Sequence, residues 1–296
     1  MGRHHHIHYV GRFAPSPTGD LHFGSLVAAL ASYLEARRHH GDWLIRIEDL
    51  DPPRVVSGSA ERIVTDLARF GMTSDRPIVF QSERFAAYAE AIQSLLANGL
   101  AYWCGCSRRD LNADGSYPGT CANGLPPGRK PRAVRLRVPA ERVRFVDRIQ
   151  GPVSCDLSVA GDFVIRRADG LAAYQLAVAL DDAFQGITDV VRGADLLDST
   201  ARQIHVLSCL GLPAPDYAHV PVVMGADGGK LSKSTASDPV RSGEEIHALR
   251  AALEFLGHPP PLVDFESTWA WALENWTIKQ VPARPPGPTG LWGADG

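Results

Sequence analysis

The first hundred residues alternate between short apolar stretches and longer amphipathic ones, and this alternation restricts the chain to few folds. The apolar stretches have the length of buried strands, while the amphipathic ones repeat their apolar side chains with helical spacing. The order strand, helix, strand, helix, strand predicts a right-handed parallel α/β unit. We expect strands within residues 7–13, 42–51 and 77–81, and helices within residues 24–39, 58–70 and 83–99.

The alternation breaks after residue 100 and resumes near Tyr174. Between them lies a segment rich in Cys, Gly, Pro, Asn and Asp, followed by β-like runs at 133–138, 143–149 and 162–167, which predicts an insertion between two halves of one open sheet. A chain of 296 residues is long enough for such a core. The expected parts are the two α/β halves (1–100 and 173–238), the α+β insertion (101–172) and a short helical C-terminal segment (239–296).

Charge and cysteine content exclude several classes of protein. A net charge of −3 excludes a protein that is basic over its whole surface, although residues 129–148 hold eight Lys and Arg against two acids. That segment is either a solvated strand face or a face that contacts phosphates. Five unevenly spread cysteines favour a reducing compartment over a disulfide framework. With no apolar run of membrane-spanning length and no signal peptide, we expect a cytoplasmic protein without membrane contact.

Residues 13–30, FAPSPTGDLHFGSLVAAL, place a rigid turn of small residues before an apolar helical run. Prolines fix the backbone, and Gly19 and Gly24 remove side-chain bulk. A helix that begins near Gly24 directs its free N–H groups and positive dipole end at the preceding turn, which is a natural phosphate site. His22 could donate a further hydrogen bond to that phosphate, or it could be a structural histidine.

A second polar motif, KLSKS, spans Lys230 to Ser234 between glycines on one side and a polar run on the other. It could be a solvated surface loop. Alternatively, two lysines on a mobile glycine-flanked loop could close over a triphosphate as charge builds up on it.

Three cysteines of the insertion lie within one polar loop, CGCSRRDLNADGSYPGTC, which has no core of its own. Cys104, Cys106 and Cys121 therefore suggest a structural zinc site with four ligands, against the alternative of free thiols clustered by chance. The residues themselves leave the fourth ligand open among Tyr117, Cys155 and Asp114. Cys155 and Cys209 have the pattern of ordinary core cysteines.

The two polar motifs in this order, on either side of a split α/β sheet, resemble the HIGH and KMSKS signatures of class I aminoacyl-tRNA synthetases. The words RFAPSPTG, RIEDLDPPR, AYQLAVALDD and RGADLLDSTARQ resemble the catalytic core of glutamyl-tRNA synthetases, over about residues 10–235. The resemblance implies a Rossmann-like parallel sheet split by a zinc-containing insertion that binds a tRNA end. One departure is Ser25 at the last position of HIGH.

The resemblance also implies the residues of the site. Arg12 and Arg192 are forks suited to the two carboxylates of glutamate, and which takes which stays open. Glu48 suits the ammonium group, and Tyr174 offers a hydroxyl. Related enzymes place a tyrosine where Tyr117 stands, which selects it as the fourth zinc ligand. The implied catalytic residues are His22, Lys230 and Lys233; for glutamate, Arg12, Phe13, Ala14, Pro15, Ser16, Glu48, Tyr174 and Arg192; for ATP, His22, Gly24, Ser25 and Lys233; for zinc, Cys104, Cys106, Tyr117 and Cys121.

The implied chemistry begins with attack of the glutamate α-carboxylate on the α-phosphorus of ATP. Because the nucleophile is already an anion, no general base is needed, and catalysis consists of positioning and charge neutralisation. His22, the helix start, Lys233 and Mg²⁺ would neutralise the charge. A second step would pass the glutamyl group to a hydroxyl.

Three features resemble the glutamyl-Q tRNA(Asp) synthetases: the short segment after KLSKS, the run LHFGSLVAAL and the cysteine loop. These paralogues attach glutamate to queuosine in the anticodon of tRNA(Asp). This implies an anticodon stem-loop as partner, no anticodon-binding domain, and a monomer. One alternative is a truncated glutamyl-tRNA synthetase that charges a 3′ end. Another is a catalytically silent paralogue that binds RNA, against which His22, Glu48, Arg192 and Lys233 argue by being present.

Overall fold

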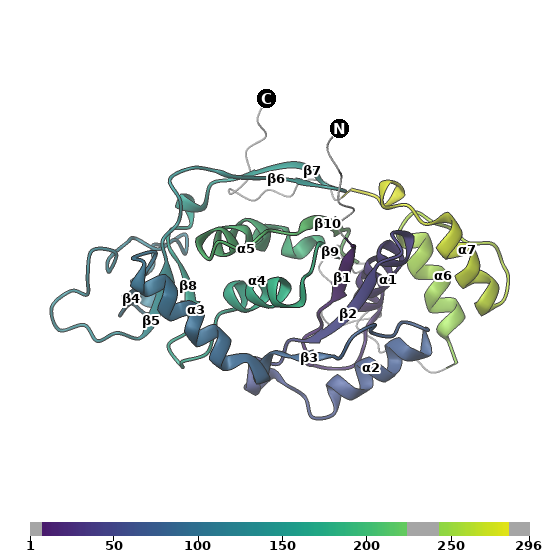
Figure 1. Ribbon diagram of the computed structural model, residues 1–296, viewed down its shortest axis with the longest axis horizontal. Helices are drawn as coiled ribbons and strands as arrows, with labels where there is room; N and C mark the ends of the chain where they lie inside the picture. Colours follow the sequence, from purple (N-terminus) through teal and green to yellow (C-terminus); the bar gives the residue numbers. More distant parts are fainter. Residues whose placement is uncertain (1–7, 224–242, 284–296) are drawn as a thin grey trace.

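The computed structural model describes residues 8–223 and 243–283 (Figure 1). The lysine motif, with Lys230 and Lys233, lies outside the described residues. Among the described helices, none is both long and apolar enough to cross a membrane. In chain order the main elements are β1 (Val10–Phe13), α1 (Phe23–Arg38), β2 (Asp42–Ile47), α2 (Ser59–Arg69), β3 (Val79–Phe80), α3 (Phe85–Ala97), β4 (Ala101–Cys104), β5 (Ala133–Leu136), β6 (Val143–Asp147), β7 (Gly151–Cys155), β8 (Phe163–Arg166), α4 (Tyr174–Gln185), β9 (Asp189–Gly193), α5 (Leu197–Cys209), β10 (Asp216–Val220), α6 (Glu245–Phe255) and α7 (Phe265–Asn275).

The two α/β halves lie side by side, but as two hydrogen-bonded sheets rather than the one open sheet that the sequence predicts. Strands β1, β2 and β3 pair in parallel, and β9 pairs in parallel with β10. The halves are tied where β1 lies beside β9: the N–H of Thr188 donates to the carbonyl of Val10 (3.0 Å), and the N–H of Val10 donates to Oγ1 of Thr188 (2.9 Å). The carboxyl ends of β1, β2, β9 and β10 therefore lie near one another, where open α/β sheets bind ligands.

Helix α1 forms because its leucines recur with helical spacing and its two ends carry suitable groups. Leu26, Leu30 and Leu34 are buried in the largest apolar cluster of the described chain, which β2 and the C-terminal helices also line. His22 is the N-cap residue, and Arg37 and Arg38 occupy the last turn, where cations are favoured by the helix dipole. This helix fixes the start of the first motif against the sheet.

The insertion contributes to two different sheets. Strands β4, β5 and β8 form a separate antiparallel sheet. Strands β6 and β7 form a hairpin, and β6 pairs in parallel with β10 through Asp147 and Tyr217. The strand order β7-β6-β10-β9 makes the hairpin an extension of the catalytic sheet (Figure 1). The predicted insertion is thus continuous with the second α/β half.

Two elements differ from the sequence expectations. The pattern shows no strand at β7, because Gly151 and Pro152 disfavour one; β7 is an edge strand, where proline is tolerated. The pattern also shows a single helix after residue 239, whereas the structure has α7 as well. Asp264 caps α7 by accepting from the N–H of Ser267 (2.8 Å). Beyond its end, Trp276 donates from Nε1 to the buried Glu35 of α1 (2.7 Å).

Candidate active site

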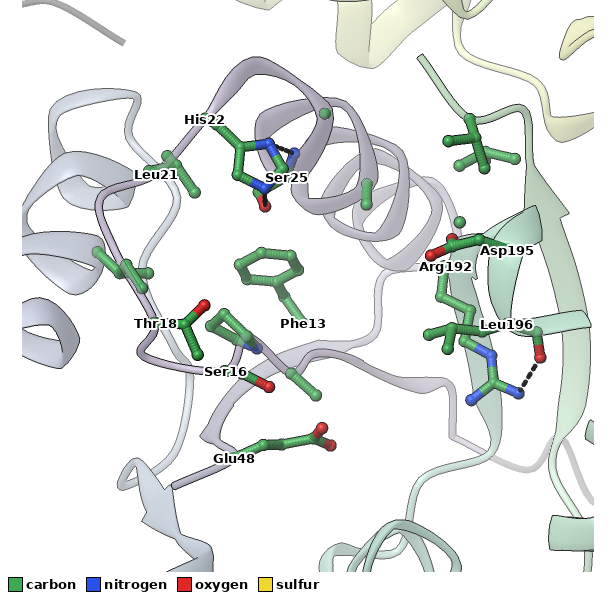
Figure 2. Close-up of a pocket in the computed structure, with 18 of the residues that line it drawn as sticks. Phe13, Ser16, Thr18, Leu21, His22, Ser25, Glu48, Arg192, Asp195 and Leu196 are labelled. Atoms are coloured by element: carbon green, nitrogen blue, oxygen red, sulfur yellow. Dashed lines mark hydrogen bonds between the residues drawn. The ribbon is translucent and has the colours of Figure 1, made fainter. Parts of the chain in front are cut away.

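A pocket of about 630 Å³ opens at the carboxyl ends of β1, β2, β9 and β10, against the starts of α1 and α4 (Figure 2). It brings together every predicted glutamate and ATP residue that the structure describes. The pocket also has residues to which the sequence reasoning gave no role, among them Thr18, Asp20, Arg54 and Asp195. The predicted residues in its wall are Arg12, Phe13, Ala14, Pro15, Ser16, His22, Gly24, Ser25, Glu48, Tyr174 and Arg192.

His22 and Ser25 form one end of this pocket, at the start of α1 (Figure 2). The N–H of Ser25 donates to Nδ1 of His22 (3.2 Å), and Nε2 of His22 lies 3.0 Å from Oγ of Ser25. Because Nδ1 accepts, the ring proton is on Nε2. The serine that replaces the second histidine of the HIGH signature thus holds the first one with its proton at Nε2.

Glu48 and the guanidinium of Arg192 lie in the lower half of Figure 2, whereas His22 lies near its top. Glu48 follows β2 and accepts a hydrogen bond from Nη2 of Arg46 (3.2 Å). Burial raises the pKa of Glu48, while the guanidinium groups of Arg46 and Arg12 act against that rise. A cationic ligand group beside Glu48 would likewise favour the carboxylate.

Arg12 is paired with a carboxylate of the protein. Its Nε and Nη2 donate to the two oxygens of Asp182 (3.1 and 3.5 Å), and Nη1 of Arg46 donates to the same Asp182 (2.7 Å). Burial alone would raise the pKa of Asp182, but the two arginines lower it overall. Arg12 therefore lines the pocket but shares its charge with Asp182, which lies behind it.

Arg192 has a different environment. Its Nε donates to Nε2 of His219 (3.0 Å), and its Nη2 donates to Oγ1 of Thr200 (2.9 Å) and to the carbonyl of Leu196 (3.3 Å). Among the described residues, its buried Nη1 has no hydrogen-bond partner. Since a buried unpaired donor is costly, Nη1 is the group of this pocket most in need of a ligand oxygen.

Tyr174 is the first residue of α4 and lines the same pocket. Burial of its hydroxyl and the nearby Glu48 carboxylate raise the pKa of Tyr174 to about 12. The hydroxyl therefore stays protonated at neutral pH and can donate as well as accept.

Sequence reasoning missed the polar residues behind the pocket: Arg46, Asp182, Thr200 and His219, all buried. The sequence does hold a sign of Asp181 and Asp182, because these two carboxylates directly continue the apolar helical run AYQLAVAL. A charged side chain on the buried face of a helix requires a partner of opposite charge.

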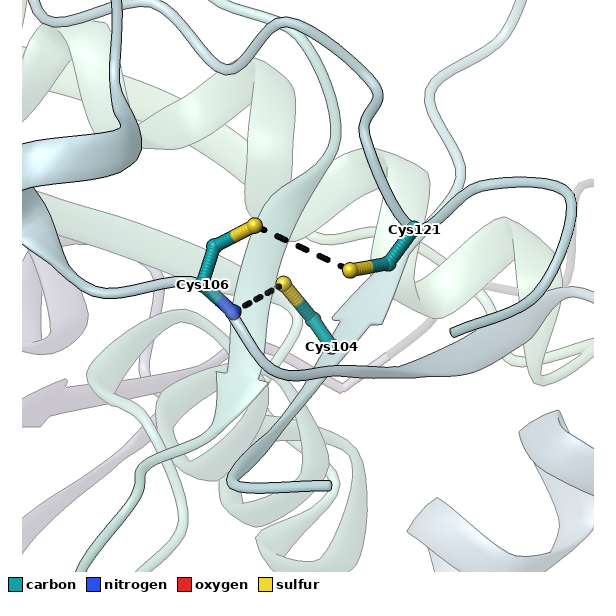
Figure 3. Close-up of side chains that lie close together, drawn as sticks. All are labelled: Cys104, Cys106 and Cys121. Carbon is teal, nitrogen blue, oxygen red and sulfur yellow. Dashed lines mark hydrogen bonds between the residues drawn. The ribbon is translucent and has the colours of Figure 1, made fainter. Parts of the chain in front are cut away.

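The three cysteines of the insertion converge on one point (Figure 3). Their sulfur atoms all lie within 4.8 Å of one another, and those of Cys106 and Cys121 are 3.7 Å apart. Tetrahedral zinc with Zn–S bonds near 2.3 Å separates two sulfurs by about 3.8 Å. The buried cluster therefore could hold a metal ion.

Of the three candidates for a fourth ligand, only Tyr117 adjoins these sulfurs. Its hydroxyl is 3.5 Å from Sγ of Cys104 and accepts from the N–H of Cys121 (2.9 Å). Cys155 packs in another cluster, with Leu157, and Asp114 accepts from Ser116 on the surface.

The basic segment 129–148 is mostly bound within the protein. Arg129 pairs with Asp110 (2.7 Å), and Arg148 pairs with the buried Glu35 (2.9 Å). Arg135, Arg137 and Arg142 donate to backbone carbonyl groups within the insertion or just before it. A phosphate-contacting face would therefore rest on the remaining, exposed residues, Lys130, Arg132 and Arg144.

Comparison with known proteins agrees with this geometry. The family model described as tRNA synthetases class I (E and Q), catalytic domain, matches residues 9–116 and 125–249. A solved glutamate tRNA ligase from Elizabethkingia meningosepticum, in complex with its amino acid, has a TM-score of 0.79 at 25% identity, over 94% of this chain and 66% of that one. The glutamate-tRNA synthetase of Elizabethkingia anophelis has a TM-score of 0.78 at 25% identity, over 93% and 67%. The chain thus spans about two thirds of the length of those enzymes, and its fold is that of a class I tRNA synthetase.

Curated relatives show which family of class I tRNA synthetases the chain belongs to. The glutamyl-Q tRNA(Asp) synthetase of Aromatoleum aromaticum is 54% identical over 286 residues, which cover 93% of this chain and 90% of that protein. The protein of the same name from Chromobacterium violaceum is 51% identical over 94% of this chain and 96% of its own length. The chain belongs to the glutamyl-Q tRNA(Asp) synthetase family.

Proposed function

We propose that this enzyme activates L-glutamate with ATP and transfers it to the queuosine base in the anticodon of tRNA(Asp). The family supports the reaction and its acceptor. The observation that carries the amino-acid step is the unpaired, buried Nη1 of Arg192, in one pocket with Glu48 and with the phosphate-binding turn at His22.

Glutamate recognition follows from the charges of the pocket. The Arg192 guanidinium is held by neutral acceptors and offers its full charge to a carboxylate, while Glu48 offers a carboxylate to the ammonium group. Tyr174 adds a hydroxyl, and residues 13–16 form the adjoining wall. Arg12 contributes mainly through the pair it forms with Asp182, which keeps the strand end in place.

ATP would place its phosphates at the start of α1. The backbone N–H groups of the first helical turn and the Nε2–H of His22 are donors there, and Gly24 leaves the backbone accessible. Lys230 and Lys233 would add positive charge from the second motif, and Mg²⁺ would enter with ATP as its counter-ion. The glutamate carboxylate attacks the α-phosphorus, pyrophosphate leaves, and glutamyl-adenylate remains.

In the second step a hydroxyl of the queuosine ring attacks the carbonyl carbon of the adenylate, and AMP leaves with the bonding electron pair. The anticodon stem-loop would lie along the insertion, where Lys130, Arg132 and Arg144 are exposed. Residues 1–100 and 173–238 would form the catalytic domain and 101–172 the RNA-binding part, with 239–296 as a helical support, in a cytoplasmic monomer.

We further propose that the cysteine cluster holds one structural Zn²⁺, with Cys104, Cys106, Cys121 and Tyr117 as ligands. Burial and the neighbouring sulfurs raise the pKa of Cys106 to about 11. A bound cation would remove this cost of collecting thiolates at one point. With four protein ligands the ion would act only in folding the loop.

The proposal is tested in two assays on the purified full chain. ATP–pyrophosphate exchange should require glutamate and Mg²⁺ but no tRNA, because the pocket is complete without RNA. Glutamate transfer should survive a block of the tRNA(Asp) 3′ end and vanish when guanine replaces queuosine. Equal labelling of the guanine form, lost on blocking the 3′ end, would favour the alternative of a truncated glutamyl-tRNA synthetase.

A further inference from the structure

Behind Arg192 lies a chain of buried polar groups that the proposed reaction does not itself use. His219, on β10, is fully buried, and its Nε2 accepts the hydrogen bond from Nε of Arg192 (3.0 Å). Its Nδ1 lies 2.6 Å from Oδ2 of Asp147. Because Nε2 accepts, the ring proton must be on Nδ1 and is donated to Asp147.

Asp147 is fully satisfied as a carboxylate. Its second oxygen, Oδ1, accepts from the backbone N–H groups of Ile149 (3.0 Å), Gln150 (2.8 Å) and His219 (3.2 Å). Within the described part of the chain, four N–H donors thus face this side chain and no acceptor does. The pKa of Asp147 is lowered: burial acts to raise it, but these donors, His219 first among them, more than offset that effect.

The guanidinium of Arg192 is held from two sides. Its Nε donates to His219, and its Nη2 donates to Thr200 and to the carbonyl of Leu196. These hydrogen bonds fix one side of the guanidinium against β10 and α5. Rotation of the guanidinium away from this arrangement would leave a buried Nε–H or Nη2–H without a partner. Only Nη1 remains for a ligand.

We propose that Asp147 and His219 are positioning residues for amino-acid binding: Asp147 fixes the tautomer of His219, and His219 holds Arg192 with Nη1 facing the glutamate carboxylate. This inference rests on the proposed function of Arg192. It assigns to Asp147, at the end of β6 in the insertion, a role in the amino-acid pocket of the catalytic sheet.

The protonation state of His219 suits this role. Burial lowers the pKa of His219 to about 4, Asp147 opposes the shift, and the charge of Arg192 adds to it. At neutral pH the imidazole is therefore uncharged and can accept from Arg192. An imidazolium at this place would direct a proton at the guanidinium.

Asp147→Asn tests whether Asp147 fixes the tautomer of His219, because the substitution hardly changes the shape of the side chain. An asparagine has one oxygen and one NH₂ group, whereas the site presents donors to both oxygens of Asp147. If the NH₂ faces His219, the ring proton moves to Nε2 and opposes Nε of Arg192. If it faces the three backbone N–H groups, they lose their acceptor.

The measurement is the KM for glutamate and for ATP, and kcat, in ATP–pyrophosphate exchange. Asp147→Asn and His219→Leu should raise the glutamate KM about 10- to 100-fold, since a hydrogen bond to a charged group is lost, with little change in the KM for ATP. His219→Gln should recover much of this loss, because its amide oxygen can accept from Arg192. The control is Asp156→Asn, because this half-buried carboxylate just after β7 accepts from Ser158 and does not line the pocket.

Arg192→Lys separates failure of this inference from failure of the proposed function. A raised glutamate KM in Arg192→Lys beside an unchanged one in Asp147→Asn would overturn the positioning role and leave the proposed pocket intact. An unchanged glutamate KM in Arg192→Lys would overturn the proposed use of Arg192. If Asp147→Asn fails to fold, the comparison of His219→Leu with His219→Gln decides, and equal glutamate KM values in those two variants would also refute the inference.

Discussion

Two arginines of the pocket look alike in the sequence and differ in the protein. Arg12 is paired with Asp182, which lies 170 residues away, whereas Arg192 is held by His219 and Thr200, which carry no charge at neutral pH. The sequence identifies both as carboxylate-binding candidates, but it cannot rank them, because their partners come from distant strands and helices. Burial with neutral partners leaves Arg192 as the stronger electrostatic anchor for an anion.

Glu48→Gln should weaken glutamate binding more than ATP binding. The change removes the negative charge that faces the ammonium group and leaves Arg46 with one charged partner fewer. We expect the glutamate KM to rise about tenfold or more, in line with loss of a charge-assisted hydrogen bond. Exchange kinetics with each substrate varied in turn measure this; an equal rise in both KM values would contradict the assignment.

His219 should make the stability of the fold fall with acidity. The unfolded chain binds a proton on this histidine near pH 6.5, whereas the folded protein does so only near pH 4, with Asp147, Arg192 and Arg12 as the charged groups around the ring. Stability is therefore complete above pH 6.5 and declines as the pH falls toward 4. Between pH 7 and pH 5 the decline is about 2 kcal/mol.

Urea unfolding of the unsubstituted protein and of His219→Gln at pH 7 and pH 5 measures how much His219 contributes to the loss in the free energy of unfolding. The variant should lose less stability than the unsubstituted protein on acidification. Identical losses in the two proteins would mean that His219 takes up its proton equally in the folded and the unfolded chain, which would contradict its lowered pKa.

Helices and strands with a strong local sequence pattern could be predicted from the sequence. Those that form only because a neighbouring element packs against them could not. The helix α1 and the strands β1 and β2 follow from leucine spacing, capping and apolar runs, and their predicted positions are confirmed. The strand β7 contains Gly151 and Pro152 and exists because β6 offers it a partner. The helix α7 depends on packing of its tryptophan-rich turns against the core of α1, which no local pattern reveals.

The cysteine loop between β4 and β5 should depend on metal. Cys104→Ser removes a proposed ligand whose sulfur lies within 4.8 Å of the two others. We expect loss of one equivalent of zinc and faster amide hydrogen exchange in residues 105–132, with α1 and the parallel sheet unaffected. Metal analysis and hydrogen exchange measure both effects, with Cys209→Ser as control because Cys209 lies on α5. Stoichiometric zinc in Cys104→Ser would refute Cys104 as a ligand.

For the whole molecule, the structure separates two parts of the insertion. The loop between β4 and β5 starts and ends at paired residues, Cys104 and Ala133, so a short turn could replace it without moving either strand. The hairpin β6–β7, in contrast, carries Asp147 and extends the catalytic sheet. The loop belongs to the RNA-binding part that we propose, whereas the hairpin supports the amino-acid pocket through the positioning role that we propose for Asp147.

Replacement of residues 105–132 by a short glycine-containing turn should therefore keep ATP–pyrophosphate exchange and abolish transfer to tRNA(Asp). Removal of the whole segment 101–172 should impair exchange as well, because it takes Asp147 from His219 and the strands β6 and β7 from the sheet that holds β10 and β9. The two activities of each purified variant measure this. Full transfer by the loop-replaced variant would place the RNA-binding surface elsewhere.

The pairing of β6 with β10 also bears on how the enzyme is made. Asp147 and His219 are 72 residues apart, and Arg12 and Asp182 are 170 apart, so neither contact can form until the later partner has left the ribosome. Local helices can form early, whereas contacts of such long sequence separation form late in folding. A nascent chain would thus emerge with the turn that we propose to bind phosphates first and the proposed amino-acid pocket last, and glutamate binding would report that synthesis has passed β10.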